Sequence, residues 1–278
     1  MIDFSHPEIL ECVRRALEED IGTGDVTSKA CVDAGQVARG SFLAREQQIV
    51  AGTELLPIIY TMRGGVDEVK LERLSGAGSR AGDVIATVRG RAHTLLECER
   101  VALNFLQHLG GIATLAGRYA NAVAGTGCRI LDTLKTTPGL RRLEKMATAA
   151  GGVTNHRMGL YDAILIKNNH IAAAGGVRKA IESAGSAGLP VEVEVRTREE
   201  IDEALAAGAT HLLLDNLSPE MSARHIRWIK GRAKVELSGG ITLDNVRAYA
   251  DSGADFISSG AITHSALAVD VSFRLELA

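Results

Sequence analysis

Residues 191–216, VEVEVRTREEIDEALAAGATHLLLDN, decide the fold. The stretch begins with a strand-like segment (191–196), continues with apolar residues at helical spacing (199–207) and ends in a second strand-like segment (211–216). This order is typical of a βαβ unit, whose two strands lie parallel in one sheet. The stretch therefore predicts a parallel sheet with helices packed against it.

Further strand-like segments flank this unit along the second half of the chain: 128–133, 163–167, 234–238 and 255–259. They recur at intervals of roughly 20–30 residues with helical stretches between them, as expected for successive βαβ units. The first strand is not followed by a Gly-rich dinucleotide loop, so the repeated units favour an α/β barrel over a doubly wound sheet.

The first hundred residues have mixed α and β patterns. A helix is predicted over 7–19, strands within 37–50 and 76–90, and one or two helices over 93–123, with Gly110-Gly111 as the place for a bend. We therefore expect an N-terminal α/β domain over 1–113 and a barrel domain over 114–266. The tail, 267–278, alternates like a strand that packs back on the first domain.

Composition excludes several functional classes. Lys plus Arg number 31 and Asp plus Glu 34, a net charge of −3, and aromatic residues are only 4%, so neither charge nor stacking surfaces favour a nucleic-acid partner. No apolar run approaches the ~20 residues of a membrane span, and the first six residues lack the basic-then-apolar order of a signal peptide. The four cysteines are far apart, which is typical of reduced thiols. We expect a cytoplasmic protein that acts without membrane or nucleic acid.

Polar, charged or Gly-rich residues stand at the end of every predicted barrel strand. In an α/β barrel the C-terminal strand ends share one face, which carries the active site. These ends are Asp132-Thr133-Leu134-Lys135, Lys167, Glu194, Asp215, Ser238-Gly239-Gly240 and Ser259-Gly260. Six such ends in register predict an active site at that face.

The residue types indicate the chemistry. Four side chains that carry or readily take positive charge suit an anionic substrate: Lys135, Lys167, His156 and Arg157. Glu194 and Asp215 are carboxylates on adjacent predicted strands, which among lysines suggests Mg²⁺ holding a phosphate or diphosphate. The two Gly-containing ends occupy the usual phosphate-binding position of a barrel, ahead of helices. The pattern predicts a magnesium-assisted enzyme for a phosphorylated, multiply anionic substrate.

The segment at residues 132–141, DTLKTTPGLR, resembles the DTRKTxPGLR motif of the quinolinate phosphoribosyltransferases, also called carboxylating nicotinate-nucleotide pyrophosphorylases. Further segments agree in order along nearly the whole chain: 19–27, 99–106, 155–160, 165–171, 191–195, 213–216, 237–241 and 260–265. The resemblance implies an N-terminal α/β sandwich domain and a C-terminal open, TIM-like α/β barrel. It also implies a homodimer with shared active sites; assembly beyond the dimer stays open.

The resemblance further implies transfer of a phosphoribosyl group from phosphoribosyl diphosphate to quinolinate, with release of diphosphate and carbon dioxide and formation of nicotinate mononucleotide for NAD biosynthesis. Catalytic roles would fall to Lys135, Lys167, Glu194 and Asp215, and the last two would stand near Mg²⁺, directly or through water. Substrate contacts would come from Arg100 across the dimer interface, from Thr133, His156 and Arg157, and around the 5′-phosphate from Ser238, Gly239, Gly240, Ser259, Gly260 and His264.

Three positions depart from the family pattern. Leu134 stands where the motif has an Arg that grips a substrate carboxylate, Asn168 replaces an acidic residue, and Val153 interrupts a Gly triplet. They leave open a related phosphoribosyltransferase that acts on another pyridine or aromatic acid. Two other hypotheses are a barrel aldolase or lyase with a Schiff base on Lys167 and a binding protein without turnover. Borohydride trapping and diphosphate release would distinguish them.

Overall fold

The computed structural model describes residues 3–277, which form two compact units. The first unit contains residues 3–117, 136–152 and 265–277, and the second contains residues 118–135 and 153–264. Among the helices described, none is long and apolar enough to cross a membrane.

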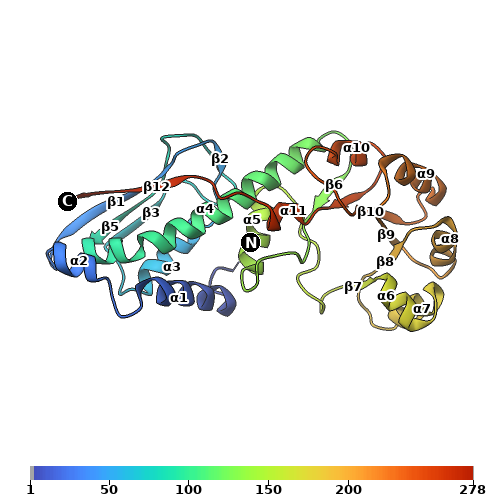
Figure 1. The fold of residues 1–278 in the computed structure, drawn as a ribbon, viewed down its shortest axis with the longest axis horizontal. Coiled ribbons are helices and arrows are strands. Elements are labelled where there is room, and N and C mark those ends of the chain that lie inside the picture. The colour runs from blue at the N-terminus through green and yellow to red at the C-terminus, as the bar shows by residue number, and fades with distance from the viewer. Residues whose placement is uncertain (1–2, 278) are drawn as a thin grey trace. The chain divides into compact units, whose positions relative to one another are not determined.

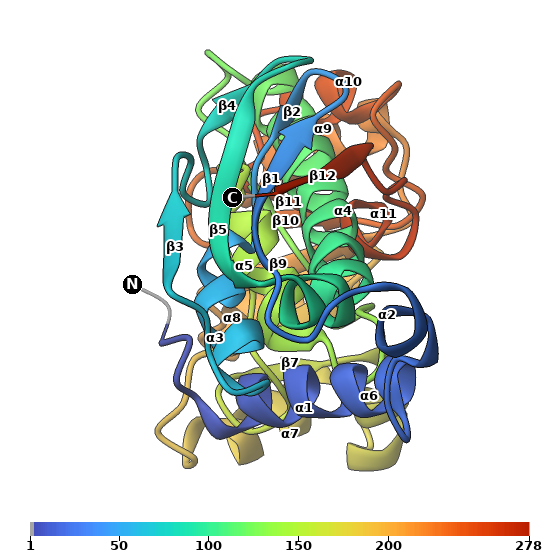
Figure 2. The same ribbon diagram turned by 90° about the vertical axis from the view of Figure 1, so that its left-hand side faces the viewer.

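The first unit is built on a four-stranded antiparallel sheet in the order β12–β1–β5–β3. Figure 2 shows β1 between β5 and β12. The strands of this unit are β1 (Val37–Ala44), β2 (Gln48–Ile49), β3 (Glu68–Leu71), β4 (Gly78–Ser79), β5 (Val84–Arg91) and β12 (Val271–Leu277). Its helices are α1 (Pro7–Ile21), α2 (Val26–Cys31), the 3₁₀ turn η1 (Thr53–Leu55), α3 (Leu56–Thr61), most of α4 (Ala92–Ala122) and α5 (Arg141–Ala150).

One hydrophobic core joins this sheet to its helices. Val13 of α1, Phe42 of β1, Leu109 of α4 and Met146 of α5 are all buried in it. Burial of each such side chain stabilises the fold by roughly 1.5–3 kcal/mol. The arrangement matches the expected α/β sandwich.

Helix α4 runs without interruption through Gly110-Gly111, where the sequence suggested a bend. A Cβ at Gly111 would overlap the carbonyl oxygen of Leu267, and one at Gly110 would lie 2.8 Å from Val269 Cγ2. The glycines are therefore needed because the C-terminal tail crosses the helix closely. Beyond the crossing, the tail becomes β12 and pairs with β1.

The second unit is a six-stranded parallel sheet in the order β6–β11–β10–β9–β8–β7. Its strands are β6 (Arg129–Leu131), β7 (Ile164–Ile166), β8 (Val191–Val195), β9 (His211–Asp215), β10 (Lys234–Ser238) and β11 (Phe256–Ser258). Its helices are α6 (Asn168–Ala174), α7 (Val177–Gly185), α8 (Arg198–Ala206), α9 (Pro219–Ile229), α10 (Val246–Ala250) and α11 (Ala261–His264). In Figure 1, α7 to α10 lie on the outer side of the strands.

The sheet order identifies an open barrel. The last strand, β11, pairs with the first, β6, as in a barrel and unlike a doubly wound sheet. Within the described part of the chain no ladder joins β6 to β7, so the barrel is open there. The predicted fold class is confirmed.

The division into units differs from the expected boundaries at 113/114 and 266/267. The first unit continues to residue 117, and residues 136–152 also belong to it, so the barrel unit is not one continuous segment. The reason is packing: Leu143, Met146 and Ala147 of α5 are buried in the core of the first unit.

Candidate active site

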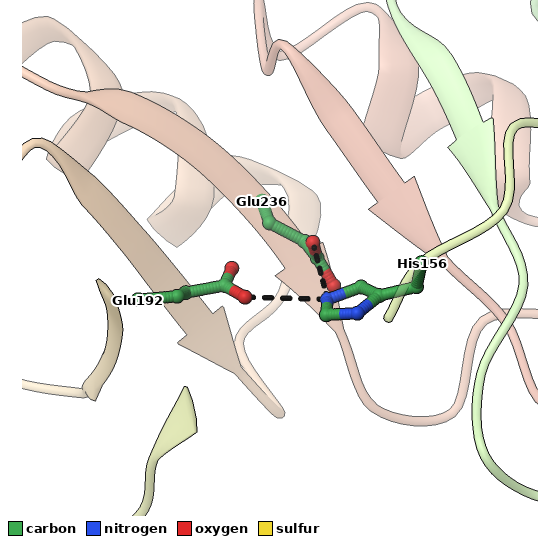
Figure 3. A group of neighbouring side chains, drawn as sticks. All are labelled: His156, Glu192 and Glu236. Carbon is green, nitrogen blue, oxygen red and sulfur yellow. Dashed lines mark hydrogen bonds and ion pairs between the residues drawn. The ribbon is translucent and has the colours of Figure 1, made fainter. Parts of the chain in front are cut away.

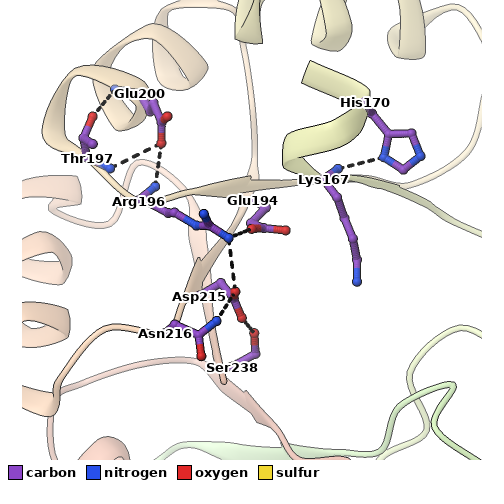
Figure 4. A network of polar contacts seen from close by, with 9 residues as sticks. All are labelled: Lys167, His170, Glu194, Arg196, Thr197, Glu200, Asp215, Asn216 and Ser238. Carbon is purple, nitrogen blue, oxygen red and sulfur yellow. Dashed lines mark hydrogen bonds and ion pairs between the residues drawn. The ribbon is translucent and has the colours of Figure 1, made fainter. Parts of the chain in front are cut away.

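Strand alternation brings three predicted site residues together at the C-terminal ends of β8, β9 and β10. Glu194 pairs in register with Leu213, and Ser238 pairs with Asp215. Asp215 Oδ1 accepts a hydrogen bond from Ser238 Oγ (2.6 Å), as Figure 4 shows. Asn216 Nδ2 donates to the other oxygen, Asp215 Oδ2 (2.6 Å). Both oxygens of this carboxylate are therefore held in place.

Arg196 completes this cluster, and the sequence analysis missed it. Its Nη2 lies 2.7 Å from Glu194 Oε1 and 3.6 Å from Asp215 Oδ2. A signal existed: residues two apart on a strand face the same side, so Arg196 follows Glu194 on the inner face. The side chain of Glu194 is only 7% exposed, and a carboxylate so enclosed requires a partner of this kind.

Lys167 directly follows β7, on the strand next to Glu194. Its backbone N–H donates to His170 Nδ1 (2.9 Å), which fixes the start of α6. Its side chain is exposed and extends away from that helix in Figure 4. Among residues 3–277 the amine has no ion-pair partner, so it is available to an anionic substrate.

Lys135 belongs to a second group at the ends of β6 and β11. Its backbone oxygen accepts a hydrogen bond from Thr263 Oγ1 (2.8 Å), and its N–H donates to Thr133 Oγ1 (3.0 Å). A Cβ at Gly260 would lie 2.6 Å from Lys135 Cδ and 3.1 Å from His264 Cδ2. Glycine at 260 thus lets Lys135 and His264 approach this turn. Ser259 is buried nearby, with its Oγ donating to Ile241 O (2.8 Å).

The turn after β10 requires glycine. Gly239 and Gly240 have φ of +92° and +63°, and a Cβ at Gly239 would overlap Asn216 Oδ1. A helix follows each Gly-containing end, as expected, but α10 begins only at Val246, so Gly239 and Gly240 lie in the loop before it. Gly260, by contrast, immediately precedes α11.

His156 points toward the carboxylates of Glu192 and Glu236, as Figure 3 shows. Its Nε2 is 3.2 Å from Glu192 Oε2 and 3.5 Å from Glu236 Oε2. Glu192 and Glu236 precede Glu194 and Ser238 by two residues, so they face the same interior below them. Glu236 was not singled out by the sequence, because it is one charge between the apolar residues Val235 and Leu237.

The surroundings of His156 and Glu192 shift the pKa of both side chains. Hydrogen bonds to Glu192 and then to Glu236 raise the pKa of His156 to about 9, against the effect of burial. Arg157 N also donates to His156 Nδ1 (2.7 Å), and a doubly protonated ring must give up this bond, which opposes part of the rise. Burial raises the pKa of Glu192, and the hydrogen bond from His156 offsets only part of that rise.

A cavity of about 330 Å³ extends from His156, Glu192 and Glu236 toward the N-terminal ends of the barrel strands. Its lining includes residues that begin strands, Arg129, Lys234 and Phe256, together with His156 and Arg157. Arg157 Nη1 donates to Ala163 O (3.0 Å). The structure therefore places His156 and Arg157 deeper than the carboxylates at the strand ends.

The remaining residues fall outside these groups. Arg100 is exposed on the part of α4 that belongs to the first unit. Of the three departures, Leu134 is half-buried beside Lys135 in sequence, Val153 is buried, and Asn168 is the first residue of α6. 

Two groups of side chains carry atoms of the kind that bind metal ions. Glu194 and Asp215 offer hard carboxylate oxygens from adjacent strands, each with lone pairs left for a water or an ion, and this donor set fits Mg²⁺. Donor atoms of His156, Glu192 and Glu236 lie within 4.8 Å of one another, but they already satisfy each other.

Comparison with known proteins identifies the family. The model of the quinolinate phosphoribosyl transferase C-terminal domain matches residues 112–274, and that of the N-terminal domain matches residues 25–110. A probable nicotinate-nucleotide pyrophosphorylase [carboxylating] of Bacillus subtilis is 38% identical, covering 99% of this chain and 96% of its own. The nicotinate-nucleotide pyrophosphorylase [carboxylating] of Mycobacterium leprae is 40% identical, covering 95% and 96%.

Solved structures agree with these matches. NadC from Streptococcus pyogenes superposes with a TM-score of 0.93 at 37% identity over the whole of both chains. The nicotinate-nucleotide pyrophosphorylase from Francisella tularensis gives 0.92 at 34% identity over 99% of this chain and 100% of its own. From its sequence, its two domains and its fold, the chain belongs to the quinolinate phosphoribosyltransferase family.

Proposed function

We propose that this protein transfers the phosphoribosyl group of phosphoribosyl diphosphate to quinolinate, with release of diphosphate and carbon dioxide, to give nicotinate mononucleotide for NAD biosynthesis. The observation that carries this proposal is the enclosed carboxylate pair Glu194 and Asp215 at the strand ends, with the exposed Lys167 after the neighbouring strand. The family membership and the names of its full-length relatives support it.

Glu194 and Asp215 act on the ribose. The pyridine nitrogen is a weak nucleophile, so the site must favour departure of diphosphate. As the bond to diphosphate breaks, positive charge develops at the anomeric carbon, and fixed carboxylates stabilise it without reorganisation. Hydrogen bonds from Ser238 and Asn216 hold the Asp215 carboxylate in place. Bound Mg²⁺ would neutralise charge on the leaving group, held by Glu194 and Asp215 directly or through water.

Cationic side chains bind the anionic parts of both substrates. Lys135 and Lys167 face phosphate and carboxylate charge, and the turns at Gly239-Gly240 and Ser259-Gly260, with His264, bind the 5′-phosphate. Arg157, with His156 behind it, and Thr133 complete the acceptor site. We also propose a homodimer in which the partner subunit's Arg100 contacts a substrate carboxylate.

Decarboxylation follows transfer. Once the ring nitrogen carries the ribose, it is quaternary, and its positive charge stabilises the electron pair that stays on C2 as the bond to the carboxylate breaks. Carbon dioxide leaves and a proton is added at C2. The protein needs to hold the ring and little more. We expect this chemistry in the cytoplasm, without membrane or nucleic acid, and the four cysteines are free thiols.

Diphosphate release over a panel of pyridine carboxylates tests the proposal. Quinolinate is expected to give the fastest release, dependent on Mg²⁺. Preferential turnover of another acid would instead support the remodelled acceptor site that Leu134 suggests. Borohydride added with substrate should trap nothing on Lys167, since the reaction involves no Schiff base.

A further inference from the structure

Arg196 is held in a defined place at the barrel mouth. It follows β8 and precedes α8, and its backbone N–H donates to Glu200 Oε2 (2.7 Å). Glu200 N in turn donates to Thr197 Oγ1 (3.2 Å), which closes a capping box at the start of α8 (Figure 4). The backbone that carries the guanidinium is therefore fixed.

The guanidinium occupies the position of a counter-ion. Nη2 contacts Glu194 Oε1 at 2.7 Å and lies 3.6 Å from Asp215 Oδ2. These are the two carboxylates that the proposed function assigns to Mg²⁺. A guanidinium and a divalent cation repel each other at such distances. The repulsion is stronger here than in water, because the surroundings of the enclosed carboxylates have a lower dielectric constant. Arg196 and Mg²⁺ therefore compete for the carboxylate oxygens of Glu194 and Asp215.

The exposed part of this cluster is Arg196 itself. Its side chain is 48% exposed, against 7% for Glu194 and 19% for Asp215. A guanidinium has five N–H donors in a planar fork that fits phosphate oxygens, and the contacts above use Nη2 alone. A phosphorylated ligand that enters the mouth therefore meets this cation first.

We propose that Arg196 is a substrate-binding residue with two successive partners. In the free protein it holds Glu194 and Asp215, and when Mg²⁺ takes these carboxylates it turns to the diphosphate group of phosphoribosyl diphosphate. This inference rests on the proposed function. It assigns the diphosphate end of the site to an arginine that directly follows β8.

The test measures binding rather than turnover. Mn²⁺ is titrated into the full chain and followed by electron paramagnetic resonance, and inorganic diphosphate is then titrated in the presence of Mn²⁺. In Arg196→Gln, Mn²⁺ should bind at least tenfold more tightly and diphosphate at least tenfold more weakly. Arg198→Gln is the matched control, because Arg198 lies over the Trp228 ring at 3.3 Å instead, and it should change neither affinity.

Arg196→Lys provides a second variant. It keeps the charge without the planar fork, so Mn²⁺ should bind as weakly as to the parent while diphosphate binds more weakly. This variant decides the question through diphosphate affinity if Arg196→Gln does not fold. Mn²⁺ or diphosphate affinity within twofold of the parent in Arg196→Gln would overturn the inference.

The outcome separates this inference from the proposed function. If the parent makes nicotinate mononucleotide and Arg196→Gln keeps both affinities, only the inference fails. If the parent makes no product from quinolinate, the proposed function fails, and the two titrations still decide the role of Arg196 because they need no acceptor.

Discussion

Asp215 receives a hydrogen bond at each of its carboxylate oxygens, from Ser238 and from Asn216. In Asp215→Asn one acceptor becomes a donor and the negative charge is lost, so we expect kcat to fall roughly 10²-fold or more. The melting temperature should stay close to that of the parent, because the half-buried side chain leaves no cavity in the core. Steady-state kinetics and thermal unfolding check this, with the exposed Asp251→Asn as control. A collapse of stability with activity retained per folded molecule would contradict it.

Leu134 tests the acceptor end of the site. If quinolinate is the substrate, Leu134→Arg adds a charge-assisted contact worth about 1.5–3 kcal/mol, so the quinolinate KM should fall roughly tenfold or more, with little change for phosphoribosyl diphosphate. If the pocket suits another acid, the new charge has no partner and should lower stability or activity. Kinetics with both substrates decide. An unchanged quinolinate KM would show that position 134 lies outside the carboxylate contacts.

The sequence could predict some of these residues and not others. Glu194 and Asp215 end apolar strands, so their place at the barrel mouth follows from spacing. Arg196 ends the predicted strand segment 191–196 and a polar stretch follows it, so spacing alone did not separate it from an exposed strand end. The pairing of His156 with two glutamates depends on barrel curvature across β8 and β10, which no local pattern shows.

At the scale of elements, the C-terminal tail and α4 meet at a helix surface that has no room for a side chain. Gly111→Ala places a Cβ against the Leu267 carbonyl, and we expect a loss of about 1–3 kcal/mol of unfolding free energy. Gly185→Ala, at the end of α7, meets nothing within 4 Å and should be neutral or stabilising by up to about 1 kcal/mol. Denaturant titration compares the two. Equal effects would mean that the tail does not press on α4.

Helix α5 carries a buried carboxylate, Glu144, that holds the preceding loop in place at Thr137. Glu144 accepts hydrogen bonds from His108 Nε2 (2.9 Å) and Thr137 N (3.1 Å). Burial alone would raise the pKa of Glu144, but these bonds outweigh it and lower the pKa below its usual 4.5. A lowered folded-state pKa gives stability that is present above about pH 4.5 and lost as the pH falls through the folded value.

Unfolding free energy against pH measures this contribution. The parent should lose stability more steeply below pH 4.5 than Glu144→Gln, whose amide does not titrate. Parallel curves would show that folding does not lower the pKa of Glu144.

The barrel strands were predictable because each is a short apolar run with a polar end. The place of α5 was not, because its apolar face at Leu143 and Met146 fits either unit, and only tertiary packing assigns it to the first. The glycines of α4 were likewise ambiguous between a bend and a close approach.

At the scale of the whole molecule, the proposed dimer predicts that subunits share sites. Arg100→Ala and Lys167→Ala should each be inactive, and a mixture of the two should regain part of the activity, since a hybrid dimer can hold one intact site. Activity is measured after subunit exchange has been verified by mass. No recovery in verified hybrids would count against shared sites.

The central claim is that this chain joins quinolinate to phosphoribosyl diphosphate and removes the carboxylate next to the ring nitrogen. Quinolinate labelled with ¹³C at the 2-carboxylate, followed by NMR with the purified protein, tests it most directly. We predict that the label appears as carbon dioxide and bicarbonate only when phosphoribosyl diphosphate and Mg²⁺ are present, in amounts equal to the diphosphate and nicotinate mononucleotide formed. Label that remains on the pyridine while diphosphate is released, or no conversion at all, would contradict the account.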